Sequence, residues 1–346
     1  MKTMNFSIIG TGSALPGTCQ SNEVLAKLMD TSDQWIRERT GIEGRHILNK
    51  AKLSDIAKRA ALKAVKDAGI DPKELDLILC TTVRGDFATP ATACIVQKDI
   101  GADCPAFDMN AGCCGFIVAL DVASAYFAAG KVKKMLIVSA EAMSRCMDWH
   151  DRSTCVLFGD GAGAVVLEQG DSLQAIKLTT KGNADYLRIA NSFGNCPIDE
   201  RYLTEKNPEA DVVSEFSQEI DYKEDGTPYE YLKMDGQGTY KFAISSMCRE
   251  IPLTLEMAGI TMEDVDYFLP HQANLRIIDG ARTRLKIPKE KTRTNLQHCG
   301  NTSSASIPLL LDEMNRKGEL HRDDILLLSA FGAGLTTATC VLKWAK

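Results

Sequence analysis

The sequence lacks the features that would place a protein in a membrane, outside the cell or on nucleic acid. No uninterrupted apolar run reaches the roughly 18 residues that a membrane-spanning helix needs. The first residues, MKTMNFSIIGTGSALPG, contain no long apolar stretch of the secretion-signal kind and predict a strand that ends in a Gly-rich turn. A net charge of −6 offers no basic field to neutralise phosphates. We therefore expect a cytoplasmic protein that binds neither membranes nor nucleic acid.

Cysteine is not scarce, but its usual structural patterns are absent. No C-x-x-C pair occurs among the twelve cysteines, and no set of cysteines and histidines has the spacing of a zinc site. Cysteines scattered through a long chain without a secretion signal are typical of buried apolar side chains rather than disulfides. We expect no structural metal.

The apolar pattern predicts an α/β fold. With 346 residues, 45% of them hydrophobic, the chain can bury a large core. Apolar β-rich runs alternate with helical stretches, which is typical of central sheets covered by helices. The expected strands are 5–10, 75–82, 106–109, 134–140, 162–168, 265–269, 324–330 and 337–342. The expected helices are 22–29, 52–68, 91–101, 114–129, 238–258, 275–285 and 307–317.

The order of these elements predicts two similar halves, residues 1–172 and 173–346. In each half a strand is followed by a residue with a reactive side chain and then by a helix. Residues 183–233 depart from this pattern because they are polar and acidic. A surface insertion is the simpler interpretation, since surface loops tolerate added length. A lid or a partner-contact element is the alternative, which is kept open by the aromatic residues Tyr222, Tyr229 and Tyr231.

Cys113 is the first candidate for chemistry. It lies in NAGCCGF, between the expected strand 106–109 and the apolar helix 114–129. The start of a helix presents unpaired N–H groups and the positive end of the helix dipole, and both favour the nucleophilic thiolate. The alternative is that Cys113 and Cys114 are buried in a packing turn rich in small residues.

His271 and Asn301 are the second and third candidates. His271 ends an apolar strand, with Gln272 and Asn274 beside it, and strand tips are where α/β enzymes present functional groups. A lone histidine at such a position is more often structural. Asn301 lies in the turn HCGNTSSAS before a helix, where it or Ser303 could simply cap that helix.

Together the three residues predict a nucleophile accompanied by two hydrogen-bond donors. A cysteine with two hydrogen-bond donors at element junctions has the composition of an activated nucleophile and its stabilising groups. A Gly-rich turn, SAFGAGL (329–335), follows a strand near the C-terminus. Its N–H groups could complete an oxyanion hole, in which one donor is typically worth roughly 100- to 1,000-fold in rate.

Six motifs follow one another along the chain: TSDQWIRERTGIEGRH (31–46), FDMNAGCCGF (107–116), FGDGAGAVVL (158–167), PHQANLRI (270–277), GNTSSASIP (300–308) and AFGAGLTTAT (330–339). In this order they resemble β-ketoacyl-[acyl carrier protein] synthase III, of the thiolase superfamily. The resemblance covers nearly the whole chain except residues 183–233. It implies a thiolase-like fold of two duplicated α-β-α-β-α halves, with the active site between them, in a homodimer.

The resemblance also implies a role for each site residue. The first cysteine of the pair, Cys113, is the nucleophile, and His271 and Asn301 bind the malonyl thioester carbonyl. The N–H groups of Cys113 and Ala333 form the acyl oxyanion hole, with alanine where the family usually has glycine. Phe331 matches the aromatic residue that lies against the malonyl group.

The implied reaction is a decarboxylative Claisen condensation that initiates fatty acid synthesis. An acyl-CoA transfers its acyl group to the cysteine and releases CoA. Malonyl-[acyl carrier protein] then loses carbon dioxide, and its enolate attacks the acyl thioester to give 3-oxoacyl-[acyl carrier protein]. No metal or organic cofactor is required. Trp35 and Arg152 match the residues that sandwich the CoA adenine, Arg39 matches a further CoA contact, and Asn274 matches a residue of the pantetheine tunnel.

A basic run in this acidic protein predicts a docking surface for an acidic carrier protein, steered by opposite charge. A solvated helix face is the alternative interpretation. The run consists of Arg276, Arg282, Arg284, Lys286, Lys289, Lys291 and Arg293.

Two departures from the family pattern limit the prediction of the substrate. Thr89 occupies the position where short-chain members have an aromatic residue that closes the acyl pocket across the dimer, so we expect branched or longer primers. The acidic segment 183–233 favours the alternative of a specialised synthase or acyltransferase that acts on an unusual acyl thioester in secondary metabolism. Asn301 argues against a hydroxymethylglutaryl-CoA synthase, and the complete triad argues against a non-enzymatic scaffold.

Overall fold

A computed structural model describes residues 5–190 and 231–346, and its framework consists of two sheets. The first sheet has the order β1-β7-β6-β4-β5. Its strands are β1 (Asn5–Ala14), β4 (Leu77–Thr81), β5 (Ala106–Met109), β6 (Lys134–Ala142) and β7 (Asp160–Gly170). β4 pairs in parallel with β5 and β6, whereas β7 is antiparallel to β1 and β6. Every residue of β4 is buried, because helices cover both faces of this sheet.

The second sheet has the order β11-β12-β13-β8. Its strands are β8 (Leu173–Asn183), β11 (Tyr267–Pro270), β12 (Ile325–Gly332) and β13 (Gly334–Lys343). Only the β11–β12 pair of this sheet is parallel. Two short ribbons stand apart from the sheets, one of β2 (Gln20–Ser21) and β3 (Gly44–Arg45), the other of β9 (Leu187–Ile189) and β10 (Leu232–Met234).

The helices begin and end at recognisable signals. α7, for example, starts after Asp235, whose carboxylate accepts hydrogen bonds from two backbone N–H groups, and ends at Gly259 with φ +70°. None of the described helices is long and apolar enough to cross a membrane. The helices are α1 (Asn22–Ala26), α2 (Asp33–Thr40), α3 (Leu53–Ala68), α4 (Thr92–Ile100), α5 (Gly115–Ala128), α7 (Gly236–Ala258), α8 (Leu275–Arg284), α9 (Leu296–Cys299) and α10 (Ser306–Arg316).

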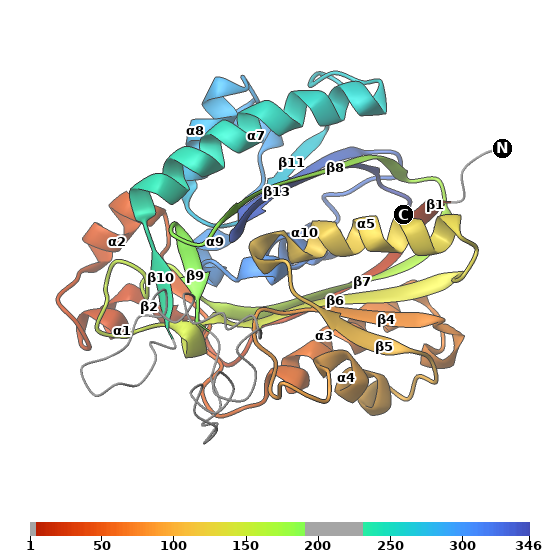
Figure 1. Cartoon of the computed structure of the whole chain (residues 1–346), viewed down its shortest axis with the longest axis horizontal. Coiled ribbons are helices and arrows are strands. Elements are labelled where there is room, and N and C mark those ends of the chain that lie inside the picture. The colour runs from red at the N-terminus through yellow and green to blue at the C-terminus, as the bar shows by residue number, and fades with distance from the viewer. Residues whose placement is uncertain (1–4, 191–230) are drawn as a thin grey trace, which may run out of the picture.

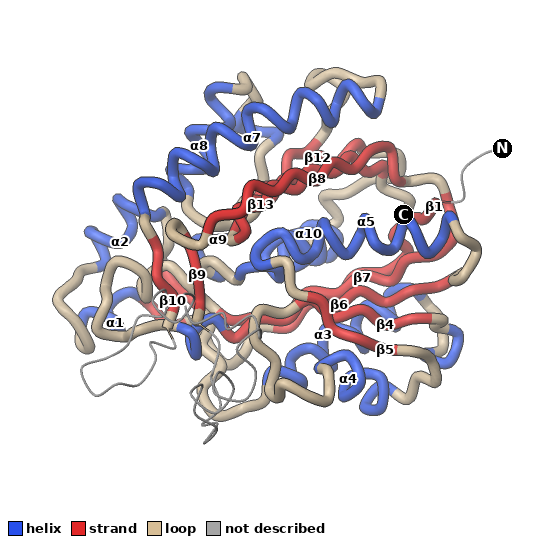
Figure 2. Tube along the Cα trace, viewed as in Figure 1, coloured by secondary structure: helices blue, strands red, loops and turns tan. Residues whose placement is uncertain are grey.

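Helices and sheets stack in five layers, α-β-α-β-α (Figure 1). α5 and α10 lie between the two sheets, α3 and α4 cover the outer face of the first sheet, and α7 and α8 cover the outer face of the second (Figure 2). The central core joins Phe116 and Leu120 of α5 and Leu310 of α10 to strands of both sheets. The predicted thiolase-like α/β fold is confirmed.

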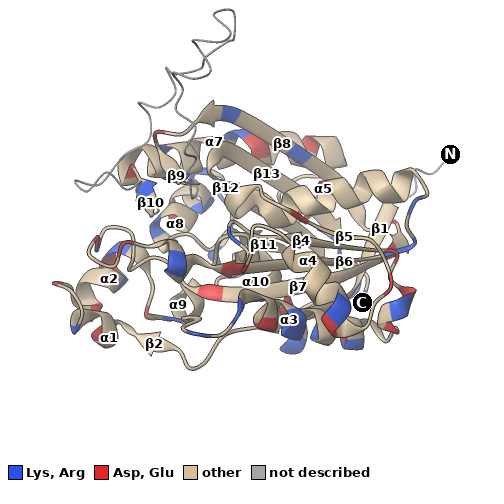
Figure 3. Ribbon diagram, turned by 60° about the horizontal axis from the view of Figure 1, so that its bottom comes forward, with Lys and Arg blue, Asp and Glu red and all other residues tan. Residues whose placement is uncertain are grey.

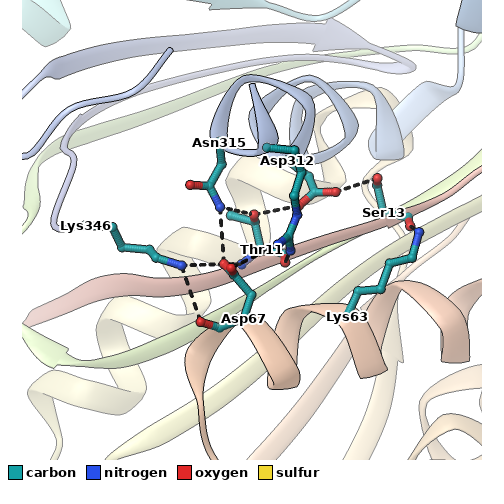
Figure 4. A network of polar contacts seen from close by, with 8 residues as sticks. Thr11, Ser13, Lys63, Asp67, Asp312, Asn315 and Lys346 are labelled. Atoms are coloured by element: carbon teal, nitrogen blue, oxygen red, sulfur yellow. Dashed lines mark hydrogen bonds and ion pairs between the residues drawn. The ribbon is translucent and has the colours of Figure 1, made fainter. Parts of the chain in front are cut away.

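A polar network fastens the two halves together beside this core (Figure 4). The Thr11 hydroxyl on β1 donates to Asp312 on α10 at 2.7 Å, and the Asn315 amide donates back to Thr11 at 2.8 Å. Asp67 on α3 accepts from Arg316 at 3.1 Å and also binds Lys346 at the end of the chain. The network thereby joins β1 and α3 of the first half to α10 and the C-terminal residue of the second half.

The first strand is longer than predicted. We expected it to end near residue 10 in a Gly-rich turn, but β1 continues to Ala14. Its glycines serve close packing instead of a turn, because a Cβ on Gly10 would lie 2.4 Å from the Ala64 carbonyl oxygen and one on Gly12 would lie 2.3 Å from the Ala60 carbonyl oxygen, both on α3.

The acidic segment 183–233 lies mostly outside the described residues, including Tyr222 and Tyr229. Its two ends are described, and they form the β9–β10 ribbon, with Tyr231 half-buried at the edge of β10. The sequence prediction had assigned no strand to these ends, nor to β8, nor a helix to α2.

Candidate active site

Two cavities meet at Cys113. The first, which we call the tunnel, has a volume of about 260 Å³ and extends from Trp35 and Arg39 on α2 to Cys113, His271 and Asn301. The second cavity, of about 640 Å³, also reaches Cys113, and its wall is formed largely by apolar and small side chains of both halves: Val83, Met143, Phe158, Leu187, Ile189, Leu232 and Ala333. The three residues that the sequence singled out are therefore brought to one place.

Cys113 lies in a 3-10 turn, η2 (Gly112–Cys114), directly before α5. Part of its side chain reaches the cavities, but protein surrounds the sulfur closely, and burial raises the pKa of the Cys113 thiol to about 12. Ser303 opposes this increase and Glu141 adds to it. The expectation that the helix start favours a thiolate is therefore wrong for the unliganded site. The loss of solvation outweighs the helix dipole here.

His271 follows β11 and is buried. Burial lowers the pKa of the imidazole to about 3, so the ring is neutral at physiological pH. Its Nδ1 lies 2.7 Å from the hydroxyl of Ser306, the first residue of α10, and the Gln272 N–H points to the same hydroxyl at 3.4 Å. A hydroxyl that accepts from Gln272 can donate to Nδ1, which favours the tautomer with its proton on Nε2. His271 then offers one neutral N–H donor to the tunnel.

Asn301 is held at both its backbone and its side chain. Its N–H donates to the Leu157 carbonyl at 2.9 Å, and its own carbonyl accepts from Gly159 at 3.0 Å. The side-chain Oδ1 accepts from the Ser303 N–H at 2.9 Å. Because the oxygen is occupied, the Nδ2 amide is the end that remains to donate. Asn301 is therefore more than a helix cap, since it lines the tunnel with a donor.

Comparison with known proteins identifies the family of this site. Residues 107–183 match the family 3-Oxoacyl-[acyl-carrier-protein (ACP)] synthase III, and residues 255–344 match the C-terminal part of the same family. The β-ketoacyl-[acyl-carrier-protein] synthase III of Clostridium acetobutylicum is 43% identical over 98% of both chains. The chain belongs to the β-ketoacyl-[acyl-carrier-protein] synthase III family. It is an acyltransferase of the condensing type.

Solved structures agree with this assignment. The crystal structure of 3-oxoacyl-[acyl-carrier-protein] synthase III from Aquifex aeolicus covers 98% of this chain with a TM-score of 0.84 and 38% identity, and all of that chain is covered. The priming β-ketosynthase of the R1128 polyketide pathway is 31% identical, with a TM-score of 0.85, over 99% of this chain and 97% of its own. Relatives of two kinds, named for a carrier-protein synthase and for polyketide priming, thus share the fold over the full length.

In this synthase the Gly-rich turn packs against the nucleophile. A Cβ on Gly332 would lie 2.9 Å from Cβ and 3.0 Å from the backbone N of Cys113, and a Cβ on Gly112 would lie 3.7 Å from the backbone N of Ala333. At Gly332 only a residue without a side chain allows this approach of the end of β12 to η2, and Gly112 has φ +52°, a conformation that favours glycine. The backbones of Cys113 and Ala333 thus lie close together, and the sharing of one oxyanion by their N–H groups stays a prediction. Phe331 lies edge-on to His271, with ring centroids 5.5 Å apart.

The predicted CoA residues gather at the outer end of the tunnel. The guanidinium carbons of Arg39 and Arg152 lie 4.6 Å and 5.2 Å from the centroid of the Trp35 ring, within cation–π range. Asn274 caps α8 through Arg276 N–H at 2.8 Å, and its amide donates to the Arg39 carbonyl at 3.0 Å. These contacts join α2 to α8. With Arg152 beside Trp35, the mouth of the tunnel is built from three distant parts of the chain.

The members of the basic run differ in exposure. Arg276 is exposed beside the tunnel mouth, where it borders a surface pocket with Arg39 and Asn274, and Arg284 and Lys286 are exposed at and just beyond the far end of α8. α8 lies next to α2 (Figure 3). Arg282 forms an ion pair with Asp279 at 3.1 Å. Lys289 is exposed, whereas Lys291 donates to backbone carbonyls and Arg293 lies over the ring of Tyr267. Helical geometry separates residues that are neighbours in the sequence.

Thr89 is exposed and lines neither of the two cavities. Its expected role, at the acyl pocket across the dimer, requires a second copy of the chain and stays a prediction.

Ser306 and Glu141 are the residues that sequence reasoning missed. Ser306 had no signal of its own, since serines are common in that turn, whereas Glu141 is an acidic residue inside an otherwise apolar stretch of β6 and could have been noticed.

Proposed function

We propose that the protein condenses an acyl-CoA primer with malonyl-[acyl carrier protein], giving 3-oxoacyl-[acyl carrier protein], CoA and carbon dioxide, and so initiates fatty acid synthesis. The observation that carries the proposal is the position of Cys113 where two cavities meet, with the donors His271 and Asn301 on the tunnel side. One cavity can hold the thioester arm while the other holds the acyl chain. All groups that the reaction needs belong to the chain itself, so we propose no cofactor.

In the first stage the acyl group moves from CoA to Cys113. The sulfur attacks the thioester carbonyl, the oxyanion is stabilised by the Cys113 and Ala333 N–H groups, and the bond from carbonyl carbon to CoA sulfur breaks. The Cys113 proton leaves with the CoA thiol. Because burial raises the pKa of Cys113 to about 12, this proton must be transferred during the attack and not before it.

In the second stage malonyl-[acyl carrier protein] loses carbon dioxide. The electron pair of the broken C–C bond passes into an enolate, whose oxygen accepts hydrogen bonds from His271 Nε2–H and Asn301 Nδ2–H. The enolate carbon attacks the acyl thioester, a new C–C bond forms, and the Cys113 sulfur leaves and regains a proton. A neutral imidazole fits this role because its Nε2–H donates a hydrogen bond without the ring first having to take up a second proton.

Mass spectrometry of the intact protein tests the proposal. After mixing with acetyl-, isobutyryl- and octanoyl-CoA, the protein should gain one acyl mass, and carbon dioxide should be released only when malonyl-[acyl carrier protein] is added. We expect the branched or longer acyl groups to load well, since Thr89 provides no aromatic wall. Strict preference for acetyl-CoA would refute the pocket prediction. Acyl loading without carbon dioxide release would favour a plain acyltransferase.

A second candidate is a priming synthase in secondary metabolism. It is favoured by the full-length similarity to the priming β-ketosynthase of a polyketide pathway. The higher identity to the Clostridium acetobutylicum synthase favours the first candidate. Condensation with the carrier protein of fatty acid synthesis, compared with a polyketide carrier protein, distinguishes the two.

Carrier docking should depend on charge at the tunnel mouth. Changing Arg276 to glutamate should raise the KM for malonyl-[acyl carrier protein] about tenfold and leave acyl transfer from CoA nearly unchanged, because opposite charge steers the acidic carrier. Lys73→Glu makes the same charge change at an exposed position before the amino end of β4, far from the tunnel mouth, and should have no effect. Equal KM values for the wild-type protein and Arg276→Glu would remove Arg276 from the docking surface.

We further propose that the protein acts as a cytoplasmic homodimer. β5 is the last strand of its sheet in the described chain and carries the exposed Phe107, and an apolar strand edge is a ready pairing surface. A reducing compartment would keep the Cys113 thiol free. The molar mass in solution, measured by light scattering, would contradict the dimer if it equals that of one chain.

A further inference from the structure

Glu141 is a buried carboxylate beside the site that the reaction described above does not use. It lies near the carboxyl end of β6 and is 1% exposed. It lines neither cavity. Burying an ionisable group costs free energy unless its neighbours compensate, so the contacts of this carboxylate indicate what it holds in place.

The two carboxylate oxygens of Glu141 bind two different parts of the molecule. Oε1 accepts the Ser304 hydroxyl at 2.6 Å and lies 3.4 Å from the Ser304 N–H. Oε2 accepts the Val83 N–H at 3.0 Å, with the Thr82 hydroxyl at 3.5 Å. Ser304 belongs to the C-terminal half and Val83 to the N-terminal half, so one carboxylate bridges the two halves.

On the Ser304 side the contact leads to Asn301. Ser303 and Ser304 belong to the 3-10 turn η6 (Ser303–Ala305), and Ser303 has φ +49°, a conformation that residues other than glycine rarely adopt. The N–H of this strained residue fixes the Asn301 side-chain oxygen at 2.9 Å. A backbone in such a conformation persists only where its surroundings hold it. Glu141 supplies that hold, because it binds the very next residue through both the hydroxyl and the N–H.

On the Val83 side the contact leads to the second cavity, which Val83 lines together with Cys113. We infer that Glu141 is a positioning residue that holds the Asn301 turn and the Val83 wall in one arrangement, and so aligns the Asn301 amide with the acyl group on Cys113. The inference rests on the proposed function. It assigns Glu141 no contact with substrate and no proton transfer.

Changing Glu141 to glutamine tests the inference, because the two side chains have nearly the same shape but the amide keeps only one acceptor oxygen, so one of the two contacts, to Ser304 or to Val83, loses its acceptor. We expect the rate of condensation to fall roughly 10- to 100-fold, the scale on which misplaced catalytic groups lose rate. Loading of Cys113 by acyl-CoA needs no Asn301, so it should change by less than about threefold on the same scale. Glu141→Asp, which keeps the acceptors, should recover part of the loss.

Glu250→Gln is the matched control. Glu250 on α7 is also a buried carboxylate, but its partners Lys177 and Arg249 are not in the Asn301 turn. This variant should leave the ratio of condensation to loading near the wild-type value. If it lowers the ratio as much as Glu141→Gln does, general damage to the fold explains both, and the inference is overturned.

Ser304→Ala tests the same inference from the other side of the contact, and it does so even if Glu141→Gln does not fold. Ser304→Ala removes the 2.6 Å contact to Glu141, together with the weaker 3.2 Å contact from the Thr81 hydroxyl, and should lower the same ratio; in a double variant the two losses should not add. An unchanged ratio in Ser304→Ala, or fully additive losses, would contradict the positioning role. Failure of the wild-type protein to load or condense would instead reject the proposed function itself.

Discussion

Replacing Cys113 by alanine is expected to abolish both acyl loading and condensation. The acyl group then has no atom to which it can be attached, and enzymes that lose a covalent nucleophile lose up to roughly 10⁶-fold in rate. The intact mass of the variant should stay unchanged after mixing with acyl-CoA. Condensation should be measured with radiolabelled acyl-CoA and malonyl-[acyl carrier protein], because a coupled assay would not reach such low rates.

The neighbouring cysteine is the natural control for this experiment. Cys114 is fully buried, and its sulfur lies 3.4 Å from the Thr336 carbonyl, on the other side of the turn from the tunnel. Cys114→Ala should keep acyl loading and lose only some stability, as expected for a small cavity in a core. Loading that survives in Cys113→Ala and disappears in Cys114→Ala would overturn the assignment of the nucleophile.

Replacing His271 by alanine is expected to lower the rate of condensation by roughly 100- to 1,000-fold, the usual cost of one oxyanion donor. The enolate would then rely on Asn301 alone. The loss should appear in the rate of carbon dioxide release from malonyl-[acyl carrier protein], which does not depend on the identity of the acyl primer. His321→Ala removes an exposed histidine outside both cavities and should have no effect.

The pH dependence checks the protonation state on which this prediction rests. Burial lowers the pKa of His271 from 6.5 to about 3, so its folded form binds its proton less tightly than the unfolded chain does. The ring in the folded protein therefore stays neutral as the pH falls through 6.5, whereas the unfolded chain takes up a proton there. His271 for this reason lowers the free energy of unfolding progressively as the pH falls from 6.5 toward 3. Wild-type carbon dioxide release that titrates near pH 6.5 and no longer does so in His271→Ala would show that the imidazole is charged in the working enzyme.

Much of the fold was predictable because local patterns encode it. β5 was predicted with its observed bounds, and the helices α3, α5 and α10 were placed to within one residue at each end. Their apolar periodicity is strong and their ends carry glycine or polar signals. α2 was missed because DQWIRERT has little apolar character, and the partly buried β8 because its pattern is weak.

The structure brings together the three site residues that the sequence singled out, but the chemical state of Cys113 differs from the predicted one. Cys113 was expected to be a thiolate because only the helix start was visible in the sequence. Burial raises its pKa, and residues far along the chain such as Phe331 and Gly332 line the cavity beside it, where no local pattern places them. For the same reason the sequence could not show which members of the basic run 276–293 are exposed and which are held by other parts of the chain.

The sequence by itself determined which residue types stand at the strand and helix ends, and six ordered motifs were enough to indicate the family. The tertiary structure alone decided that Cys113, His271 and Asn301 share one tunnel, that the first two are neutral, and that Ser306 and Glu141 support them. The physical reason is that junctions and periodicity are local properties of a chain. Protonation, tautomer and alignment depend on which distant groups exclude water and which donate hydrogen bonds, and those neighbours exist only after the two halves have packed together.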